Sequence, residues 1–336
     1  MDHEEVSLSR LWDAFTGYQR TAALRAAIEL DVFTHIAAGA ATVEALAARC
    51  KAAPRGLRAL LNHLVIDGFL TRDGERYALS ATAAAFLDRN SPGYLGSAAT
   101  FIASPMIVDS FARLTDAVRR GGTAVPDDGT LAPEHPVWVE FARAMAPLAG
   151  LTAMLLANLL DVEHAPAWKV LDIAAGHGMF GITLARLNPG VQVTALDWKN
   201  VLVVAGENAR AAGVAARFHT RAGSAFDVPF GEAYDLVLLP NFLHHFDPTT
   251  CERLLAKVRD ALAPEGRVVI VEFVPDDDRS GPPDAVRFSL IMLASTPAGD
   301  AYTFPEFQSM LRHAGFEKAT LHELLPSPGR VVIAAR

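Results

Sequence analysis

The chain has 336 residues, of which 51% are hydrophobic and 20% charged, and its formal net charge is -8. This length fits roughly two domains of ordinary size, and the composition excludes a globally disordered chain. The acidic balance argues against a nucleic-acid binder or a protein that docks on anionic membranes, because both carry a basic face. Charged residues interrupt the longest apolar stretches, so we expect no membrane span.

The cysteines and the N-terminus indicate a cellular setting. Cys50 and Cys251 stand far apart and have no second thiol nearby. They cannot build a disulfide framework or a cysteine zinc site, which favours a reducing cytoplasm and predicts no metal. The first residues, MDHEEVSLSRLWDAF, are acidic and contain no apolar signal core. We therefore expect a cytoplasmic protein.

Residues 1–100 have the pattern of a mostly helical N-terminal domain. Apolar residues recur at roughly helical spacing near the start of the chain: Leu11, Phe15, Ala22, Leu24 and Ala27. A long apolar first helix of this kind requires a partner surface, which predicts dimerisation through this domain.

A winged-helix-like order of elements follows the first helix. Thr42 is positioned to cap a helix over TVEALAARC, and Pro54 stands near the start of a second helix. The segment FLTRDGERYALS then predicts a β-hairpin with Asp73-Gly74 in the turn. Two helices and a hairpin fit either a DNA-reading module or a dimerisation module, and the acidic chain favours dimerisation.

Residues 101–165 predict a helical linker that contributes to the substrate pocket. Its longest helical stretch is HPVWVEFARAMAPLAGLTAMLLANLL, which follows a loop over 121–135 that is rich in Gly, Pro and Asp.

Residues 166–336 alternate short β-rich runs with helical segments. The runs KVLDIA, VQVTALD, ARFHTRA, YDLVLLP and RVVIVEFV predict a parallel sheet with crossover helices. Thr303 and Glu306 are spaced as a capping box for a late helix. The last two strands, KATLHEL and RVVIAAR, are separated by a turn too short for a parallel crossover, so they should be antiparallel. The fold class is therefore α/β and Rossmann-like, without the symmetrical six-strand dinucleotide topology.

The segment VLDIAAGHGMFG carries the strongest functional signal. A predicted buried strand ends at Asp172, and Gly176, Gly178 and Gly181 then turn the chain into a helix. Glycines allow the backbone to approach a ligand, and a helix N-terminus can meet an anionic group. The spacing also reads as G-x-G-x-x-G, so a nicotinamide or flavin nucleotide stays open on this loop alone. His177 within the loop should face the cofactor or solvent.

Three later segments favour S-adenosylmethionine (SAM). Asp197 ends the second strand, where a carboxylate can bind both ribose hydroxyls. Residues 221–227 follow the third strand, in position to flank an adenine, and residues 240–247 follow the fourth strand at the edge where ligands bind.

With these motifs, the chain resembles the two-domain SAM-dependent small-molecule O-methyltransferases of plant phenylpropanoid and bacterial natural-product pathways. The resemblance implies that Asp172, Gly176 and Gly178 hold the methionine end of SAM and that Asp197 holds the ribose. The family's Gly-Asp pair near the adenine reads Gly223-Ser224 here, and Asp227 is a substitute for its carboxylate. Neighbouring residues complete the predicted cofactor set, namely Trp198, Ala225, Phe226 and Asn241.

The same resemblance implies a catalytic histidine. Methylation of a hydroxyl requires a proton acceptor, and histidine titrates near neutrality. Sliding LHHFDPTTC over the family's His-Asp-Trp motif puts His244 on the base, with His245 as the alternate. Glu272 matches a glutamate that orients the imidazole. Ala301 replaces a second glutamate of the plant enzymes, unless Asp300 takes its role.

Apolar side chains from the linker and from the segment after the fifth strand should line the acceptor pocket. The candidates are Trp138, Phe141, Met145, Phe288 and Met292, of which Phe141 and Met145 match the family's F-x-x-x-M pattern. Each of them is also a plausible core residue.

Several alternatives to O-methylation stay open at this point. An N- or C-methyltransferase, or an enzyme that binds SAM without transferring methyl, fits the same scaffold. A regulator that senses SAM and reads DNA through Arg55 and Arg58 is a different class of protein.

Overall fold

A computed structural model describes residues 6–125 and 134–336 of the chain, which divides into two compact units, Met1–Ser104 and Pro105–Arg336. The first five residues and most of the loop predicted over 121–135 lie outside the described residues.

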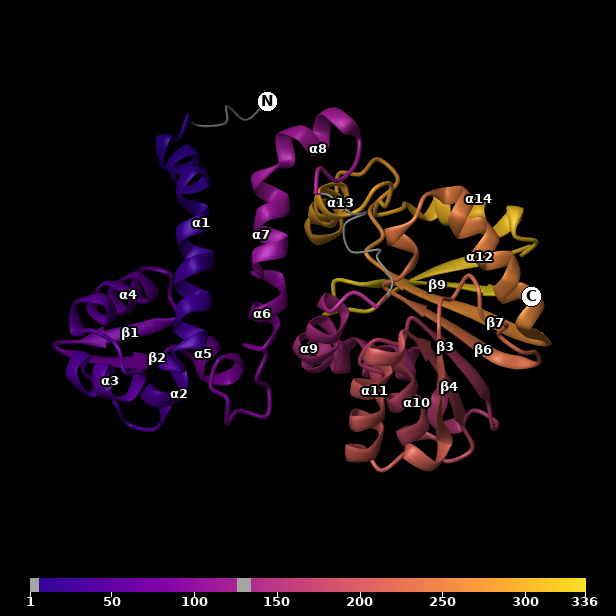
Figure 1. Ribbon diagram of the computed structural model, residues 1–336, viewed down its shortest axis with the longest axis horizontal. Coiled ribbons are helices and arrows are strands. Elements are labelled where there is room, and N and C mark those ends of the chain that lie inside the picture. The colour runs from indigo at the N-terminus through magenta and orange to yellow at the C-terminus, as the bar shows by residue number, and fades with distance from the viewer. Residues whose placement is uncertain (1–5, 126–133) are drawn as a thin grey trace. The chain divides into compact units, whose positions relative to one another are not determined.

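The N-terminal unit is built from helices and one β-hairpin (Figure 1). Its elements are α1 (Leu8–Glu29), α2 (Val32–Ala37), α3 (Val43–Cys50), α4 (Pro54–Ile66), β1 (Leu70–Asp73), β2 (Arg76–Leu79), α5 (Ala81–Phe86) and α6 (Ala98–Ile102). Its core contains Phe33, Leu46 and the α4 residues Leu57, Leu61 and Leu64, all almost fully buried. The α4 residues recur every three or four positions, so one face of this helix packs inward.

The predicted helix starts in this unit are confirmed. The Thr42 hydroxyl accepts a hydrogen bond from the amide of Ala45 at 3.3 Å and caps α3. Pro54 is the first residue of α4, where its missing N–H leaves no hydrogen bond unmade.

The hairpin is present, but its turn lies one residue later than predicted. Asp73 pairs with Arg76 in the antiparallel ladder, so the two turn residues are Gly74 and Glu75. Gly74 has a φ of +55°. A two-residue hairpin turn favours a residue that adopts positive φ at its first position, and glycine does so without a Cβ clash.

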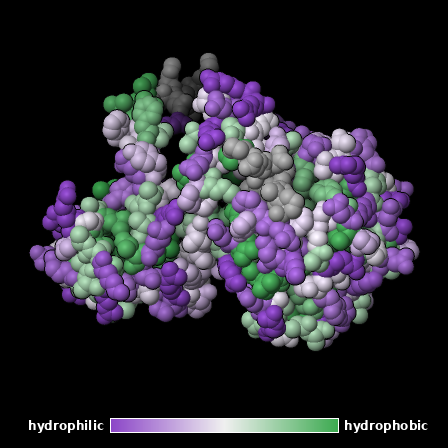
Figure 2. Space-filling view, in the orientation of Figure 1, coloured by the Kyte–Doolittle hydropathy of each residue, from purple (hydrophilic) through white to green (hydrophobic). Residues whose placement is uncertain are grey.

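Helix α1 buries only its C-terminal part. Ala27 and Ile28 belong to the unit's core, whereas Leu11 and Phe15 are 49% and 65% exposed. Figure 2 shows hydrophobic residues gathered over the first turns of this helix. The helical spacing of the sequence is confirmed, and it marks an apolar surface that this unit does not cover by itself.

The C-terminal unit contains a seven-stranded sheet between helices. Its helices are α7 (Pro105–Ala112), α8 (Leu114–Arg120), α9 (Val137–Leu159), α10 (Met179–Leu187), α11 (Lys199–Ala211), α12 (Pro248–Ala261), α13 (Pro283–Ser295) and α14 (Phe304–His313), with short 3₁₀ turns at Val162–His164, Ala215–Arg217 and Leu243–His245. Its strands are β3 (Lys169–Ile173), β4 (Gln192–Asp197), β5 (Phe218–Ala222), β6 (Tyr234–Pro240), β7 (Leu262–Glu272), β8 (Ala319–Glu323) and β9 (Arg330–Ala335).

The sheet has the order β5-β4-β3-β6-β7-β9-β8. Strands β3 to β7 pair in parallel, and β9 runs antiparallel to both β7 and β8. The prediction of five parallel strands followed by an antiparallel pair is confirmed. The capping box of Thr303 and Glu306 at the start of α14 is confirmed as well.

Each face of the sheet has its own core. Helices α9, α10 and α11 cover one face, and α12 and α14 cover the other (Figure 1). Side chains alternate between the faces along a strand. Val237 and Leu239 of β6 therefore join the α12 and α14 side, whereas Leu236 and Leu238 join the opposite side.

Helix α9 differs from one expectation. Among the described residues it is the helix long and apolar enough, by length and composition, to cross a membrane. The expectation that charges interrupt every long apolar stretch is wrong here, because the sequence runs uncharged from Ala144 to Leu160. In the structure, Ala153 and Leu156 of this helix are fully buried in the core beside α10. Only 22% of its apolar stretch is buried within the described residues, so core packing accounts for only part of its apolar composition.

Candidate active site

The predicted cofactor and catalytic residues meet at the carboxyl ends of the parallel strands. The sheet places β3 between β4 and β6, so the chain leaves β3 toward one side and later returns to its other side. In open α/β sheets, ligands bind outside the strand ends at such a reversal of strand order.

The glycine loop between β3 and α10 has the backbone that its sequence predicts. Gly176 and Gly178 have φ values of +56° and +75°. A Cβ on Gly178 would lie 3.0 Å from the ring of Phe218 and 3.1 Å from Ala205, so strand and helix pack too closely for a side chain there. The amide of Gly176 donates a 2.7 Å hydrogen bond to Asp197 Oδ2, which ties the loop to the end of β4.

Two buried carboxyl groups lie beneath this loop. Asp172 accepts a hydrogen bond from the Gly181 amide at 3.1 Å through Oδ2, while its Oδ1 is buried without a protein partner. Burial raises the pKa of Asp172 to about 7. Burial also raises the pKa of Asp197 to about 6, although the amides of Gly176 and Trp198 act in the opposite direction. A ligand that donates hydrogen bonds here would stabilise the ionised forms.

Two further cofactor candidates flank these carboxyl groups. Trp198 precedes α11 and packs against the small cluster formed by Ala142, Val201 and Val204. Asn241 follows β6 in a left-handed conformation with φ +52°, and its amide donates to Val271 of the neighbouring strand at 2.8 Å.

The turn after β5 is held by a residue that the sequence analysis missed. Gly223 has a φ of +138°, and the Ser224 hydroxyl accepts from the Phe226 amide at 3.1 Å. The ammonium group of Lys257 on α12 donates to three backbone carbonyls of this turn, at 2.9 Å to Ala225, 3.0 Å to Phe226 and 2.7 Å to residue 228. No local sequence signal links a lysine to a turn some thirty residues earlier. Asp227, which the sequence analysis gave as a substitute for the family's aspartate near the adenine, is exposed.

The histidine pair lies in a 3₁₀ turn after β6, and its two rings have different surroundings. His244 is buried, and its Nδ1 lies 2.5 Å from Glu272 Oε2. The other carboxylate oxygen of Glu272 accepts from the amides of Phe242 at 2.9 Å and His244 at 3.3 Å. Glu272 thus contacts both the ring and the backbone of the turn, at the position where the family resemblance implies an orienting glutamate.

His245 has no such carboxylate. Its ring centroid lies 4.3 Å from that of His244 and 5.3 Å from that of Trp138, which it meets edge to face. Its Nδ1 is buried without a hydrogen-bond partner. Burial, together with the neighbouring His244, lowers the pKa of His245 well below its ordinary value, so this ring is neutral.

Aromatic candidates surround the two histidines. Phe288 on α13 lies edge to face with His244 at 4.7 Å and stacks on Phe273 at 4.2 Å. Phe141 on α9 meets Trp138 edge to face at 5.7 Å and stacks with His177 at 6.1 Å.

The remaining pocket candidates follow these rings along their helices. Met145 lies one turn after Phe141 and is partly buried, and Met292 lies one turn after Phe288 and is buried. Of the two expectations for His177, exposure to solvent is wrong, because the residue is 5% exposed and its ring packs between Phe141 and Phe180, while contact with the cofactor stays a prediction. Burial lowers its pKa to about 4, which keeps it neutral.

The loop that was expected to supply a second glutamate contacts the histidine turn through its backbone. A Cβ on Gly299 would lie 2.1 Å from the carbonyl oxygen of His244, so this position admits only glycine without displacement. The Asp300 carboxylate lies 3.4 Å from Arg279 and pairs with it rather than with either histidine. Ala301 is buried and offers no charge.

Comparison with known proteins decides among the alternatives. Residues 130–317 match the O-methyltransferase domain, and residues 12–89 match the O-methyltransferase dimerisation domain. The chain belongs to the O-methyltransferase family. The methyltransferase is 34% identical over 330 residues to a 3-hydroxy-5-methyl-1-naphthoate 3-O-methyltransferase of Streptomyces sahachiroi, covering 97% of this chain and 94% of that protein.

Solved structures agree with this assignment. A putative O-methyltransferase from Nostoc punctiforme superposes with a TM-score of 0.94 at 52% identity, over 99% of this chain and 100% of that one. Human N-acetylserotonin methyltransferase in complex with SAM superposes with a TM-score of 0.84 at 25% identity, over 100% and 99% of the two chains. The protein is a SAM-dependent O-methyltransferase, and its dimerisation domain supports a homodimer.

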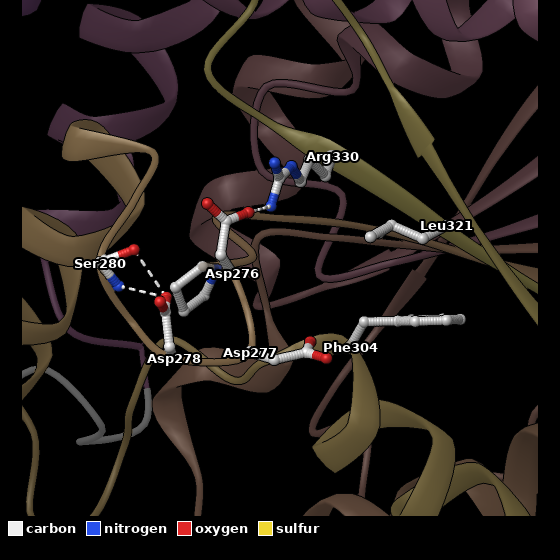
Figure 3. Close-up of a pocket in the computed structure, with 8 residues that line it drawn as sticks. Asp276, Asp277, Asp278, Ser280, Phe304, Leu321 and Arg330 are labelled. Carbon is white, nitrogen blue, oxygen red and sulfur yellow. Dashed lines mark hydrogen bonds and ion pairs between the residues drawn. The ribbon is translucent and has the colours of Figure 1, made fainter.

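The methyltransferase also has an open depression that lies away from the predicted cofactor, catalytic and acceptor residues. Its volume is about 540 Å³, and it is lined by Pro275, Asp276, Asp277, Asp278, Ser280, Phe304, Leu321 and Arg330 (Figure 3). None of the predicted cofactor, catalytic or acceptor residues lines it. Arg330 pairs with Asp276 at 2.9 Å and with Glu323 at 2.8 Å, whereas Asp277 and Asp278 add two further carboxylates, so the depression is acidic. In the described part of the chain, no group of three His, Cys, Asp or Glu side chains could hold a metal ion.

Proposed function

We propose that this methyltransferase methylates a hydroxyl of a small, mostly aromatic metabolite and that His244 accepts the hydroxyl proton. The observation that carries the proposal is the 2.5 Å contact between His244 Nδ1 and Glu272. A carboxylate at this distance holds the ring proton on Nδ1, which leaves the lone pair of Nε2 free for the acceptor. The same carboxylate stabilises the imidazolium that forms when the proton arrives.

His244 and Glu272 would act in an in-line displacement. SAM, when bound, supplies an electrophilic methyl group on a cationic sulfur. As His244 takes the hydroxyl proton, an oxygen electron pair forms the new C–O bond while the electron pair of the breaking C–S bond remains on sulfur. A positioned base of this kind contributes about 10²–10⁴ in rate, and alignment of the oxygen with the methyl carbon contributes further.

The residues around the glycine loop fit SAM. Asp172 Oδ1 is a buried oxygen without a protein partner, and Asp197 stands at the end of β4 beside the loop. We assign Asp172, Gly176 and Gly178 to the methionine end, and Asp197 to the ribose. The adenine end would then lie along the turn that Lys257 holds, with the remaining predicted cofactor residues Trp198, Gly223, Ser224, Ala225, Phe226 and Asn241.

An aromatic acceptor is supported by the side chains next to His244 and by a relative. Phe288 and Trp138 lie edge to face with the two histidines, and a planar ligand packs well against such rings. The relative from Streptomyces sahachiroi is named for methylation of a hydroxyl on a naphthoate.

The homodimer would use the exposed apolar side of α1. Leu8, Trp12 and Tyr18 are 76%, 64% and 71% exposed, and the residues matched to the dimerisation domain begin at position 12. A reducing cytoplasm fits Cys50 and Cys251, which are both free thiols.

The test of His244 is a His244→Gln variant compared with His219→Gln, an exposed position on β5. Release of S-adenosylhomocysteine (SAH) with a panel of hydroxylated aromatics should fall by about 10²–10⁴ in kcat for His244→Gln, whereas SAM affinity, measured by calorimetry, should change little. His219→Gln should behave as the wild type. Unchanged turnover in His244→Gln would contradict the proposed role of this base.

A further inference from the structure

The loop between α13 and α14 contacts the histidine turn at two points. Gly299 lies directly against the carbonyl oxygen of His244, where even an added Cβ would overlap. Three residues later, the hydroxyl of Tyr302 donates a 2.5 Å hydrogen bond to the carbonyl oxygen of Phe246, the residue that ends the turn. This hydrogen bond joins two residues that are 56 positions apart in the chain.

Tyr302 acts as a hydrogen-bond donor at this position. The residue is 4% exposed, and its ring meets that of Phe307 edge to face at 5.9 Å. Burial, followed by the nearby Cys251 thiol, raises the pKa of Tyr302, so the hydroxyl keeps its proton. The Cys251 thiol approaches the same carbonyl oxygen only to 3.8 Å, which makes it the weaker donor. The tyrosine is therefore the stronger side-chain donor to the Phe246 carbonyl.

Glu272 and Tyr302 hold opposite ends of the histidine turn. Glu272 accepts from the amides of Phe242 and His244 at the start of the turn and contacts the His244 ring at 2.5 Å. Tyr302 holds the carbonyl at the end of the turn. The ring of His244 moves with the backbone that carries it, so release of one end would shift the ring relative to Glu272 and to the acceptor. A displacement of about 1 Å at a reacting group can cost about 10²-fold in rate.

A guanidinium group fixes the loop that carries Tyr302. Arg279 donates to the carbonyl of Ala301 at 2.9 Å and makes two hydrogen bonds to the Glu306 carboxylate, at 2.9 and 2.8 Å. It also lies 3.4 Å from the Asp300 carboxylate. These contacts tie the residues before Tyr302 and the first turn of α14 to the segment after β7. A residue that positions another must itself be held in place, and these contacts meet that condition.

We propose that Tyr302 is a positioning residue for catalysis, because its hydrogen bond to the Phe246 carbonyl keeps the His244 ring aligned with Glu272 and with the acceptor hydroxyl. The inference rests on the proposed role of His244 as the base. It also assigns a function to a loop in which Ala301 offers no charge. This loop supports the base through the backbone of the histidine turn.

The test compares two tyrosine-to-phenylalanine variants that each lose one hydrogen bond to a backbone carbonyl. Tyr302→Phe keeps the ring, and its kcat for SAH release with a hydroxylated aromatic acceptor should fall about tenfold, while SAM affinity measured by calorimetry stays the same. The control, Tyr234→Phe, removes a 2.9 Å hydrogen bond to the carbonyl of Phe230 at the opposite end of β6 and should leave kcat unchanged. The melting temperatures of the two variants should fall by similar amounts, so that a difference in kcat does not reflect a difference in folding.

A second arm asks whether Tyr302 acts through His244. In the His244→Gln background, the added Tyr302→Phe change should lower the residual transfer of labelled methyl by less than about twofold, because the ring that the tyrosine positions is absent. A further fall of about tenfold in that background would overturn the positioning role. An unchanged kcat in Tyr302→Phe, or equal losses in Tyr302→Phe and Tyr234→Phe, would overturn it as well.

The outcomes separate this inference from the proposed function. Normal turnover in His244→Gln would contradict the base itself and, with it, the positioning of its ring. Loss of turnover in His244→Gln together with normal turnover in Tyr302→Phe would overturn the role of Tyr302 alone.

Discussion

Replacing Glu272 by glutamine tests the carboxylate that holds the histidine turn. Glu272 is 1% exposed and makes contacts with the amides of Phe242 and His244 and with the His244 ring. A glutamine has the same shape, and its single carbonyl oxygen can still accept from both amides. Its NH₂ group would then face His244 Nδ1 and can only donate, so the ring proton would move to Nε2.

The magnitude follows from that change of tautomer. With a proton already on Nε2, His244 cannot accept one from the substrate, so the whole contribution of the base is lost. We expect kcat to fall by about 10²–10⁴, which corresponds to about 2.7–5.4 kcal/mol of barrier. Because both amide contacts survive and the contact with Nδ1 re-forms with its direction reversed, the free energy of unfolding should change by only about 1 kcal/mol.

The assay is SAH release under saturating SAM, together with thermal melting and calorimetry of SAM binding. Glu265→Gln, at an exposed position of the same strand, is the matched control and should behave as the wild type. A kcat for Glu272→Gln within about threefold of the wild-type value would refute the reasoning, because His244 would then not depend on this carboxylate for its proton position.

Three further predictions concern the cofactor site and the histidine turn. Burial raises the pKa of Asp197 to about 6 and that of Asp172 to about 7, and hydrogen bonds from SAM favour the ionised form of each, so SAM affinity should fall as the pH drops through this range. Asp197→Asn should bind more weakly and lose up to about tenfold per pH unit of this dependence below pH 6, while the dependence on Asp172 remains. A wild-type profile as shallow below pH 6 as that of Asp197→Asn would contradict the assignment. Lys257→Met should raise the KM for SAM about tenfold with little effect on kcat, because three backbone carbonyls of the turn after β5 lose their hydrogen-bond donor. The control, Lys318→Met, changes an exposed lysine and should leave both constants unchanged. Equal KM values in the two variants would refute this role of Lys257. Gly299→Ala places a Cβ 2.1 Å from a backbone oxygen of the histidine turn, so it should cost about 1–3 kcal/mol of stability and most of the activity. In the control, Gly329→Ala, the added Cβ meets nothing closer than 3.6 Å, and the variant should be tolerated. Melting temperatures and rates of SAH release that match between the two variants would show that the contact is unimportant.

The sequence by itself determined the elements, the strand directions and the class of cofactor. Alternating β-rich and helical runs are local patterns, and a short turn before the last strand leaves only the antiparallel option. The cofactor loop was equally predictable, because Gly176 and Gly178 permit positive φ values, and this property of glycine does not depend on how the rest of the chain folds. The hairpin turn was predicted one residue too early, because the ladder register places Gly74 and Glu75 in the turn.

Only the tertiary structure shows that the two histidines have different surroundings. The residues His244 and His245 are identical in type and adjacent in sequence, and only the alignment with the family's His-Asp-Trp motif favoured His244, with His245 one residue away as the alternate. Strands β6 and β7 are neighbours in the sheet, which brings Glu272 within 2.5 Å of the His244 ring, and that contact supports His244 as the proposed base. The anchoring of the adenine-side turn by Lys257, and the close approach of Gly299 to the histidine turn, likewise depend on segments that are distant in the chain. Proton positions are set by distances of a few ångströms between such segments, and only the packed fold fixes those distances.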